Sequence, residues 1–294
     1  MKKFTRISAL TILLALSLAG CGAAPSVPET NAPSQEPEPV LYTNLTDDAS
    51  RETVISCLQT HGISQERTDT LLVWADDFNS RVTAPSLPDG FVPMDGDFVD
   101  YSSLSFTYKE LPDGTLFPEA NCRLTAFLLL GDQIQTNGSA NEADTFLMFD
   151  VEAIDTLETY QLTPEARADF ITLFNSVSVE GSDTIESHLA CIQEAWNKRG
   201  LQIDSSGGLS LIEVYLHSPF DALRFVGHTG VLVETEDGLL FVEKYGPDGP
   251  FQATAFQNRK QLETYLLARP DLYGDDTELP PIVLENGAVL DLSR

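Results

Sequence analysis

The chain has 294 residues and a formal net charge of −28, with 45 acidic residues against 17 Lys and Arg. A surface this acidic excludes nucleic acid and anionic lipid headgroups as partners, because both need a basic patch. Its apolar content of 42% is ordinary for a globular core, so we expect a folded domain.

The N-terminus has the architecture of a secretory signal peptide. Basic residues precede an apolar run over residues 7–18, which is too short to span a bilayer. We expect residues 1–20 to be removed as a lipoprotein signal peptide. The run ends in Leu18-Ala19-Gly20-Cys21, which resembles the bacterial lipobox. That resemblance implies lipid on Cys21 and an extracytoplasmic protein anchored to the cell membrane. The alternative is an ordinary signal peptide with a chance cysteine.

Residues 21–40 contain five prolines and neither Lys nor Arg. Such a segment buries too little apolar surface to offset its ordering entropy. We therefore expect residues 21–40 to form a disordered, Pro-rich tether between the lipid anchor and the domain. The remainder, residues 41–294, is expected to form a single α+β domain.

Helical patterns dominate residues 41–200. Asp47, Asp48 and Ser64 are expected helix caps, and residues 118–122 lead into a helix that carries the apolar run 124–130. The segment 84–114 is rich in Pro, Gly and Asp, and predicts irregular structure with one short strand near 98–101. The other expected helices cover residues 51–61, 64–78, 164–177 and 183–199.

Strand patterns dominate residues 201–294. Glu236-Asp237-Gly238 is a hairpin signal between two β-rich runs, and Asn286-Gly287 is another. The expected strands cover residues 209–216, 230–235, 239–245 and 251–256, followed by a short helix over 258–268 and a hairpin over 282–290. Helices first and strands second predict an α+β fold, with a helical N-terminal half followed by a small antiparallel sheet.

Cysteine context separates one thiol from the others. Apart from Cys21 there are three cysteines, an odd number without a C-x-x-C motif. Cys57 and Cys191 lie on apolar helix faces, which is typical of buried small hydrophobes. Cys122 lies at the expected start of a helix, where the backbone N–H groups, the helix dipole and Arg123 favour a thiolate. Simple packing at a helix start is the alternative for Cys122.

A thiol nucleophile requires a base, and His228 is the best placed of the four histidines because it is expected to open a strand. A purely structural histidine remains the alternative. Asn121-Cys122, the stretch 227–231 and the stretch 241–243 together resemble the papain-like NlpC/P60 and CHAP superfamily of cell-wall peptidases and amidases. The resemblance implies a papain-like core in which Cys122 is the nucleophile, His228 the base and Glu243 the residue that orients His228.

The expected hairpin register conflicts with this role of Glu243. A turn centred on Asp237-Gly238 would place Glu243 opposite Leu232, roughly 13 Å along the strand from His228. A bulge, or a turn shifted toward Thr235-Glu236, would bring it closer. Gln252 is the alternative orienting residue.

The chain as a whole resembles an uncharacterised lipoprotein family of Firmicutes, the domain of unknown function 4300. The likeness rests on residues 41–45, 121–127, 227–244 and 250–254. Because that family has no assigned function, the resemblance supports the extent of the domain and supplies no activity.

Two functions follow as expectations. The first is a membrane-anchored thiol hydrolase that cleaves an amide bond in peptidoglycan peptides or a related envelope substrate, without cofactor or metal. The second is a non-catalytic lipoprotein that binds peptidoglycan or an envelope protein on a papain-like scaffold. G-x-S-x-G and H-E-x-x-H motifs are absent from the sequence, which disfavours serine and zinc hydrolases.

Overall fold

A computed structural model describes residues 39–293 of the chain. The predictions for the signal peptide, for lipid on Cys21 and for nearly all of the tether therefore lie outside the described residues. Within residues 39–293, no helix is both long enough and apolar enough to cross a membrane.

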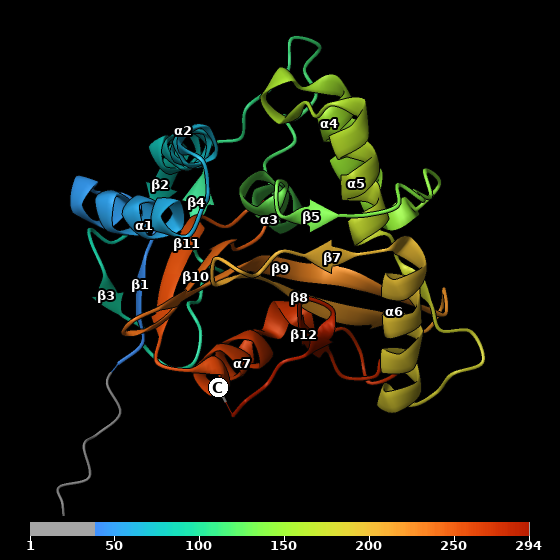
Figure 1. The fold of residues 1–294 in the computed structure, drawn as a ribbon. Helices are drawn as coiled ribbons and strands as arrows, with labels where there is room; N and C mark the ends of the chain where they lie inside the picture. The colour runs from blue at the N-terminus through green and yellow to red at the C-terminus, as the bar shows by residue number, and fades with distance from the viewer. Residues whose placement is uncertain (1–38, 294) are drawn as a thin grey trace, which may run out of the picture. The chain divides into compact units, whose positions relative to one another are not determined.

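An antiparallel sheet of nine strands organises the described part of the chain (Figure 1). Its order is β13-β12-β8-β9-β10-β11-β1-β3, with β6 pairing with β9 outside this path. The strands are β1 (Leu41–Thr43), β3 (Val92–Pro93), β6 (Val177–Ser178), β8 (Leu209–Ser218), β9 (Leu223–Thr235), β10 (Gly238–Lys244), β11 (Phe251–Phe256), β12 (Ile282–Glu285) and β13 (Ala288–Val289). Two small ladders pair β2 (Val82–Ala84) with β4 (Ser105–Phe106), and β5 (Ile134–Gln135) with β7 (Gln202–Ile203).

Seven α-helices occur within residues 39–293, so the α+β fold class is confirmed. They are α1 (Asp48–Thr60), α2 (Gln65–Arg81), α3 (Cys122–Leu130), α4 (Met148–Thr156), α5 (Pro164–Phe174), α6 (Ile185–Arg199) and α7 (Arg259–Ala268). The expected caps are present, since the side chains of Asp47 and Ser64 accept the backbone N–H groups of Ser50 and Arg67. α4 was not predicted from the sequence.

Two strand predictions were wrong in detail. Residues 98–101 do not form a strand, because Phe98 packs into an apolar cluster and Tyr101 hydrogen-bonds to other segments, with no neighbouring strand to pair. β9 begins at Leu223 rather than at residue 230, so His228 lies inside the strand and does not open it. The buried Arg224 interrupts the apolar pattern of residues 223–229, and for this reason the first part of β9 was not predicted as a strand.

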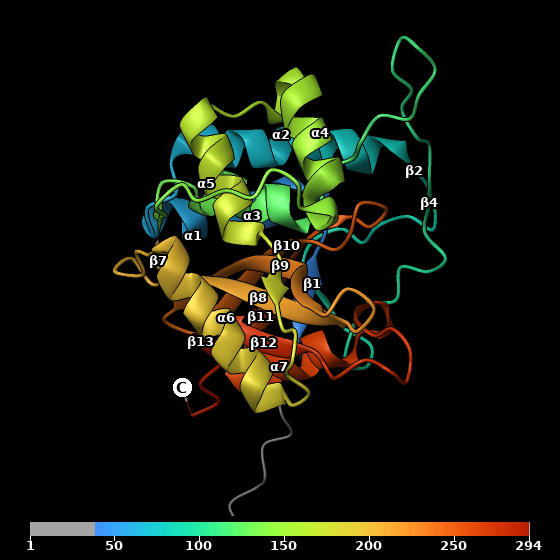
Figure 2. The same cartoon turned by 90° about the vertical axis from the view of Figure 1, so that its right-hand side faces the viewer.

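The sheet has a different cover on each face (Figures 1 and 2). Side chains such as Val231 and Val233 pack with α1, α2, α3, α5 and α6 in the larger apolar cluster. Side chains such as Leu232 and Phe241 pack with α7 and β12 in the smaller one. The alternation along β10, and along β9 from His228 onward, therefore separates a helical side from an α7 side.

A bulge interrupts β9 directly before His228. Val214 pairs with His228 but Tyr215 pairs with Val226, so Gly227 is an extra residue between them. A Cβ atom at Gly227 would lie 2.2 Å from Leu216 Cδ1, so any other residue there would force Leu216 to move. Pairing is regular from His228 to Leu232, so His228 lies on the same side as Leu232, toward α7. The bulge lets Val226, only two residues before His228, pack on the opposite, helical side.

Candidate active site

Cys122 is the first residue of α3, as the sequence predicts. Asn121 caps this helix through its side-chain oxygen, which accepts the N–H of Leu124 at 3.0 Å, and its amide nitrogen donates to Asp150 at 2.6 Å. The Cys122 side chain is buried, with 7% of the residue exposed. The capping contacts fix the helix start, and with it the position of the thiol.

Arg123 ties this helix start to β9. Its Nη2 forms an ion pair with the buried Asp150 at 2.6 Å, and its Nη1 donates to the carbonyl of Val226 at 2.8 Å, directly before the bulge. The positive charge expected beside Cys122 is therefore largely matched by Asp150. Its main geometric role is to hold the start of α3 against the part of β9 that carries His228.

Glu243 contacts His228 directly, with 2.5 Å between Oε2 and Nε2. The hairpin register explains how it reaches there. Thr235 pairs with Gly238 and Val242 with Val231, so the turn lies at Glu236-Asp237 and Glu243 sits two positions closer to His228 than a turn at Asp237-Gly238 would place it. The expected pairing of Glu243 with Leu232 was wrong, because the two-residue turn lies one residue earlier, at Glu236-Asp237.

Charge and hydrogen bonding set the protonation of this pair. Burial raises the pKa of Glu243, but the His228 and Arg269 charges and hydrogen bonds outweigh it, and the pKa falls below its usual range. Burial and Arg269 lower the pKa of His228, while Glu243 and Cys122 raise it, and the net shift is upward. A carboxylate at Nε2 requires a proton on that nitrogen, which leaves Nδ1 free to accept the thiol proton.

The pKa of the Cys122 thiol shifts in the opposite direction to that of His228. Burial raises the pKa of Cys122, but a hydrogen bond and charge from His228, together with the charge of Arg123, bring the net pKa below its ordinary value. Burial raises the pKa of Cys57, although its Sγ lies 4.0 Å from the ring nitrogen Nδ1 of His61. Cys57 and Cys191, expected on apolar helix faces, are half-buried at the edge of the larger apolar cluster. The pKa shift of Cys122 favours the thiolate, whereas that of Cys57 favours the thiol.

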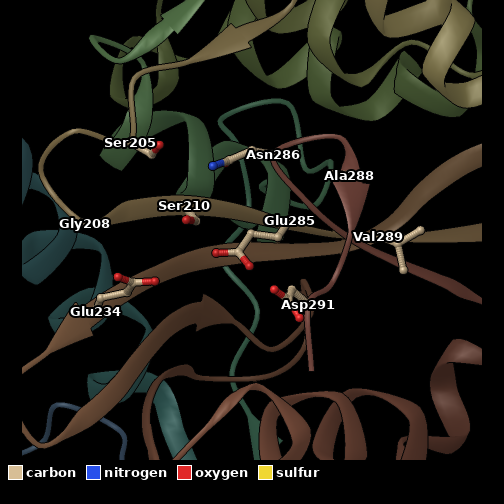
Figure 3. Close-up of a pocket in the computed structure, with 9 residues that line it drawn as sticks. All are labelled: Ser205, Gly208, Ser210, Glu234, Glu285, Asn286, Ala288, Val289 and Asp291. Carbon is tan, nitrogen blue, oxygen red and sulfur yellow. The ribbon is translucent and has the colours of Figure 1, made fainter. Parts of the chain in front are cut away.

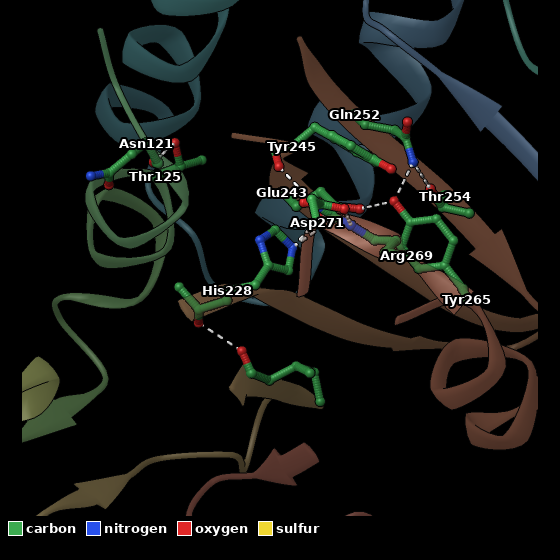
Figure 4. Close-up of polar contacts among 12 residues, drawn as sticks. Asn121, Thr125, His228, Glu243, Tyr245, Gln252, Thr254, Tyr265, Arg269 and Asp271 are labelled. Atoms are coloured by element: carbon green, nitrogen blue, oxygen red, sulfur yellow. Dashed lines mark hydrogen bonds and ion pairs between the residues drawn. The ribbon is translucent and has the colours of Figure 1, made fainter. Parts of the chain in front are cut away.

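A buried polar network behind Glu243 was missed by sequence reasoning (Figure 4). Arg269 donates through Nη1 to Glu243 Oε2 at 2.9 Å, and the Tyr265 hydroxyl donates to Glu243 Oε1 at 2.5 Å. Arg269 Nη1 also lies 3.1 Å from His228 Nε2. The only signal in the sequence was a polar Tyr265 on the apolar face of the helix over 258–268.

Gln252, the alternative orienting residue, does not contact His228 in this network. Its amide nitrogen donates to Tyr265 at 2.9 Å, and its oxygen accepts from Tyr101 at 2.6 Å. Gln252 therefore supports Glu243 through Tyr265. The geometry favours Glu243 as the residue that orients His228.

Comparison with known families identifies the domain. A model of the domain of unknown function DUF4300 matches residues 41–290. The chain belongs to the DUF4300 family. No curated protein and no solved structure matches it significantly. DUF4300 membership confirms the family likeness read from the sequence, whereas the domain boundaries and the papain-like core stay predictions.

The DUF4300 domain has other cavities away from these residues. One of about 210 Å³ is lined by Ser210, Glu234, Glu285 and Asn286 among others (Figure 3). Arg259 forms ion pairs with both carboxylates, at 2.5 and 2.6 Å. Within residues 39–293 there is no group of three or more His, Cys, Asp or Glu side chains arranged to hold a metal ion.

Proposed function

We propose that this DUF4300 protein is a thiol hydrolase of the cell envelope that cleaves an amide bond in peptidoglycan peptides or a related substrate. The observation that carries the proposal is the pairing of a helix-start thiol with a histidine held by a buried carboxylate. His228 lowers the pKa of Cys122, and Glu243 contacts the far nitrogen of the same ring. This is the arrangement that activates a cysteine nucleophile.

The chemistry follows from these three residues. The Cys122 thiolate attacks the amide carbonyl, and the electron pair moves onto the carbonyl oxygen. The backbone N–H groups at the start of α3, including that of Cys122, would stabilise this oxyanion. The His228 imidazolium then protonates the leaving amine, which gives a thioester. Water, deprotonated by His228, hydrolyses the thioester and releases the carboxylic acid and the free thiol.

The proposed location rests on the N-terminal sequence. Lipid on Cys21 would hold the domain at the outer side of the cell membrane, within reach of envelope peptides. The proposal therefore combines a lipid anchor, a Pro-rich tether over residues 21–40 and a catalytic DUF4300 domain.

The test is a cleavage assay on peptidoglycan peptides with the full-length protein. We expect new amine and carboxyl ends by mass spectrometry, lost in Cys122→Ala and retained in Cys57→Ala, the matched cysteine control. Equal cleavage by Cys122→Ala would contradict the proposal, and so would the absence of cleavage by folded wild-type protein across a panel of envelope peptides.

One observation favours the second candidate function, a non-catalytic envelope-binding lipoprotein. Only 7% of Cys122 and 2% of His228 are exposed, so a substrate reaches the pair only if the surrounding segments move. Sedimentation with purified cell wall separates the candidates. Binding that persists in Cys122→Ala, without cleavage by the wild type, supports the binding function.

A further inference from the structure

A cavity of about 100 Å³ lies beside the start of α3. Ala120, two residues before Cys122, lines it, and so does Lys244, whose charge interacts with that of Cys122. The cavity is therefore adjacent to the proposed nucleophile. It lies between the helical side of the domain, which contributes α2, and the sheet, which contributes β10 and β11.

The walls of this cavity are aromatic. Trp74 and Tyr160 meet edge to face at 5.0 Å between ring centroids, and Phe117 lies 6.0 Å from Tyr160. The Tyr160 ring is fixed in place because its hydroxyl hydrogen-bonds to the backbone of Ala120. Aromatic faces carry a negative quadrupole, so a concave aromatic site of this kind favours a cation.

Two lysines of the protein line the cavity. The Lys244 ammonium is buried over the Phe78 ring, 3.9 Å from its centroid, whereas Lys109 reaches the cavity from outside. The Lys109 ammonium lies 4.6 Å from the centroid of the Phe117 ring and 2.6 Å from Asp77 Oδ1. Arg81 occupies both oxygens of Glu119 and the other oxygen of Asp77. Lys109 thus makes the two contacts, one aromatic face and one carboxylate, by which proteins recognise a primary ammonium group.

Lys109 lies on a segment with few attachments. The backbone carbonyl of Lys109 accepts the N–H of Phe117 at 2.8 Å, and a single bridge joins Glu110 to Leu116. The side chain of Lys109 remains 35% exposed. It can leave the cavity without unfolding a helix or a strand of the main sheet.

We propose that this cavity binds a primary alkylammonium group, and that Lys109 is an internal ligand that holds the Phe117 face and the Asp77 carboxylate until such a group arrives. As a statement about the substrate of Cys122, the inference rests on the proposed function: the hydrolase would act on peptides that carry a free ammonium group near the scissile amide. Binding of an ammonium group in the cavity does not depend on whether Cys122 is a nucleophile.

The experiment is an NMR titration of the full-length protein with n-butylammonium, in wild type and in Lys109→Ala. If Lys109 occupies the Phe117 face and the Asp77 carboxylate about nine-tenths of the time, its removal should raise the apparent affinity for n-butylammonium roughly tenfold. Lys260→Ala is the matched control, because Lys260 is also an exposed lysine in an ion pair, with Glu263 at 2.7 Å. It should behave as wild type.

Two further measurements keep the test decisive. Lys109→Gln, which keeps a polar side chain, should show the same gain if Lys109→Ala folds poorly. Adding Phe117→Leu to Lys109→Ala should abolish the gain. No gain in either Lys109 variant, or equal binding of the neutral analogue n-butanol, would overturn the inference.

Repeating the titration in a Cys122→Ala background separates the two proposals. Ammonium binding there, combined with no peptide cleavage by the wild type, would refute the hydrolase alone. Cleavage of peptides without any ammonium selectivity would refute the ammonium site alone.

Discussion

Glu243 offers the sharpest test of the buried network, because the conservative change Glu243→Gln removes its charge with little change in shape. Oε2 receives contacts from His228 Nε2 at 2.5 Å and Arg269 Nη1 at 2.9 Å, and Oε1 accepts from Tyr265 at 2.5 Å. Glutamine offers only one oxygen, and its NH₂ group would face a donor. The variant therefore leaves a buried donor unsatisfied and Arg269 without its buried counter-charge.

The magnitude follows from the burial of this pair. Both Glu243 and Arg269 have fully buried side chains. Removing one partner of a buried ion pair costs about 3–5 kcal/mol. For a domain of this size, that corresponds to a fall of roughly 6–20 °C in the midpoint of thermal unfolding.

Thermal unfolding by circular dichroism measures the effect, with Glu194→Gln as control. Glu194 pairs with Lys198 one helical turn away, at 2.6 Å on an exposed surface, and its variant should melt with the wild type. Because folding lowers the pKa of Glu243, its stabilisation is lost as the pH falls through that lowered value. The variant and the wild type should therefore converge in acid. A shift at neutral pH no larger than that of Glu194→Gln refutes the reasoning.

Three further outcomes are expected. Cys21→Ser should move the protein from the membrane fraction to the medium, and unchanged membrane association would contradict the lipid anchor. Asn121→Ala removes the cap of α3 and should cost about 1 kcal/mol in urea unfolding, whereas no cost would show that the cap is redundant. Burial lowers the pKa of Lys244 to about 7, so between pH 7 and 10 the unfolded state binds the extra proton. Wild-type stability should then rise with pH by roughly 4 kcal/mol more than that of Lys244→Met, and parallel curves would contradict the shift.

Local signals predicted most elements correctly. The helix caps at Asp47 and Ser64 and the Asn286-Gly287 turn all act within a few residues of themselves. Such signals are legible in a single sequence because the physical cause lies next to the effect.

Strand pairings between segments far apart in the sequence could not be predicted from local signals. β1 and β3 come from the helical half of the chain and join the edge of the sheet beside β11, and β6 pairs with β9. Strands of two or three residues carry too little periodicity to reveal a distant partner. The sequence analysis did not predict a strand at β1, whose residues contributed only to the family likeness.

The candidate site shows the same division. The position of Cys122 at a helix start follows from Pro118 and the Asn121 cap, both local features. The contact between His228 and Glu243 depends on the turn at Glu236-Asp237, which sets the register of the hairpin. Arg269 and Tyr265 reach Glu243 from α7 and the residue after it, which no spacing within the hairpin could indicate.

The central claim is that Cys122 and His228 form a thiolate–imidazolium pair in the free protein. The direct measurement is the thiolate absorbance near 240 nm as a function of pH, taken as the difference between wild type and Cys122→Ala, because this signal does not require a reagent to enter a buried site. A midpoint well below the free-cysteine value of about 8.5, which rises by about one unit or more in His228→Ala, is the predicted result. A midpoint at or above 8.5 that His228→Ala leaves unchanged would contradict the account.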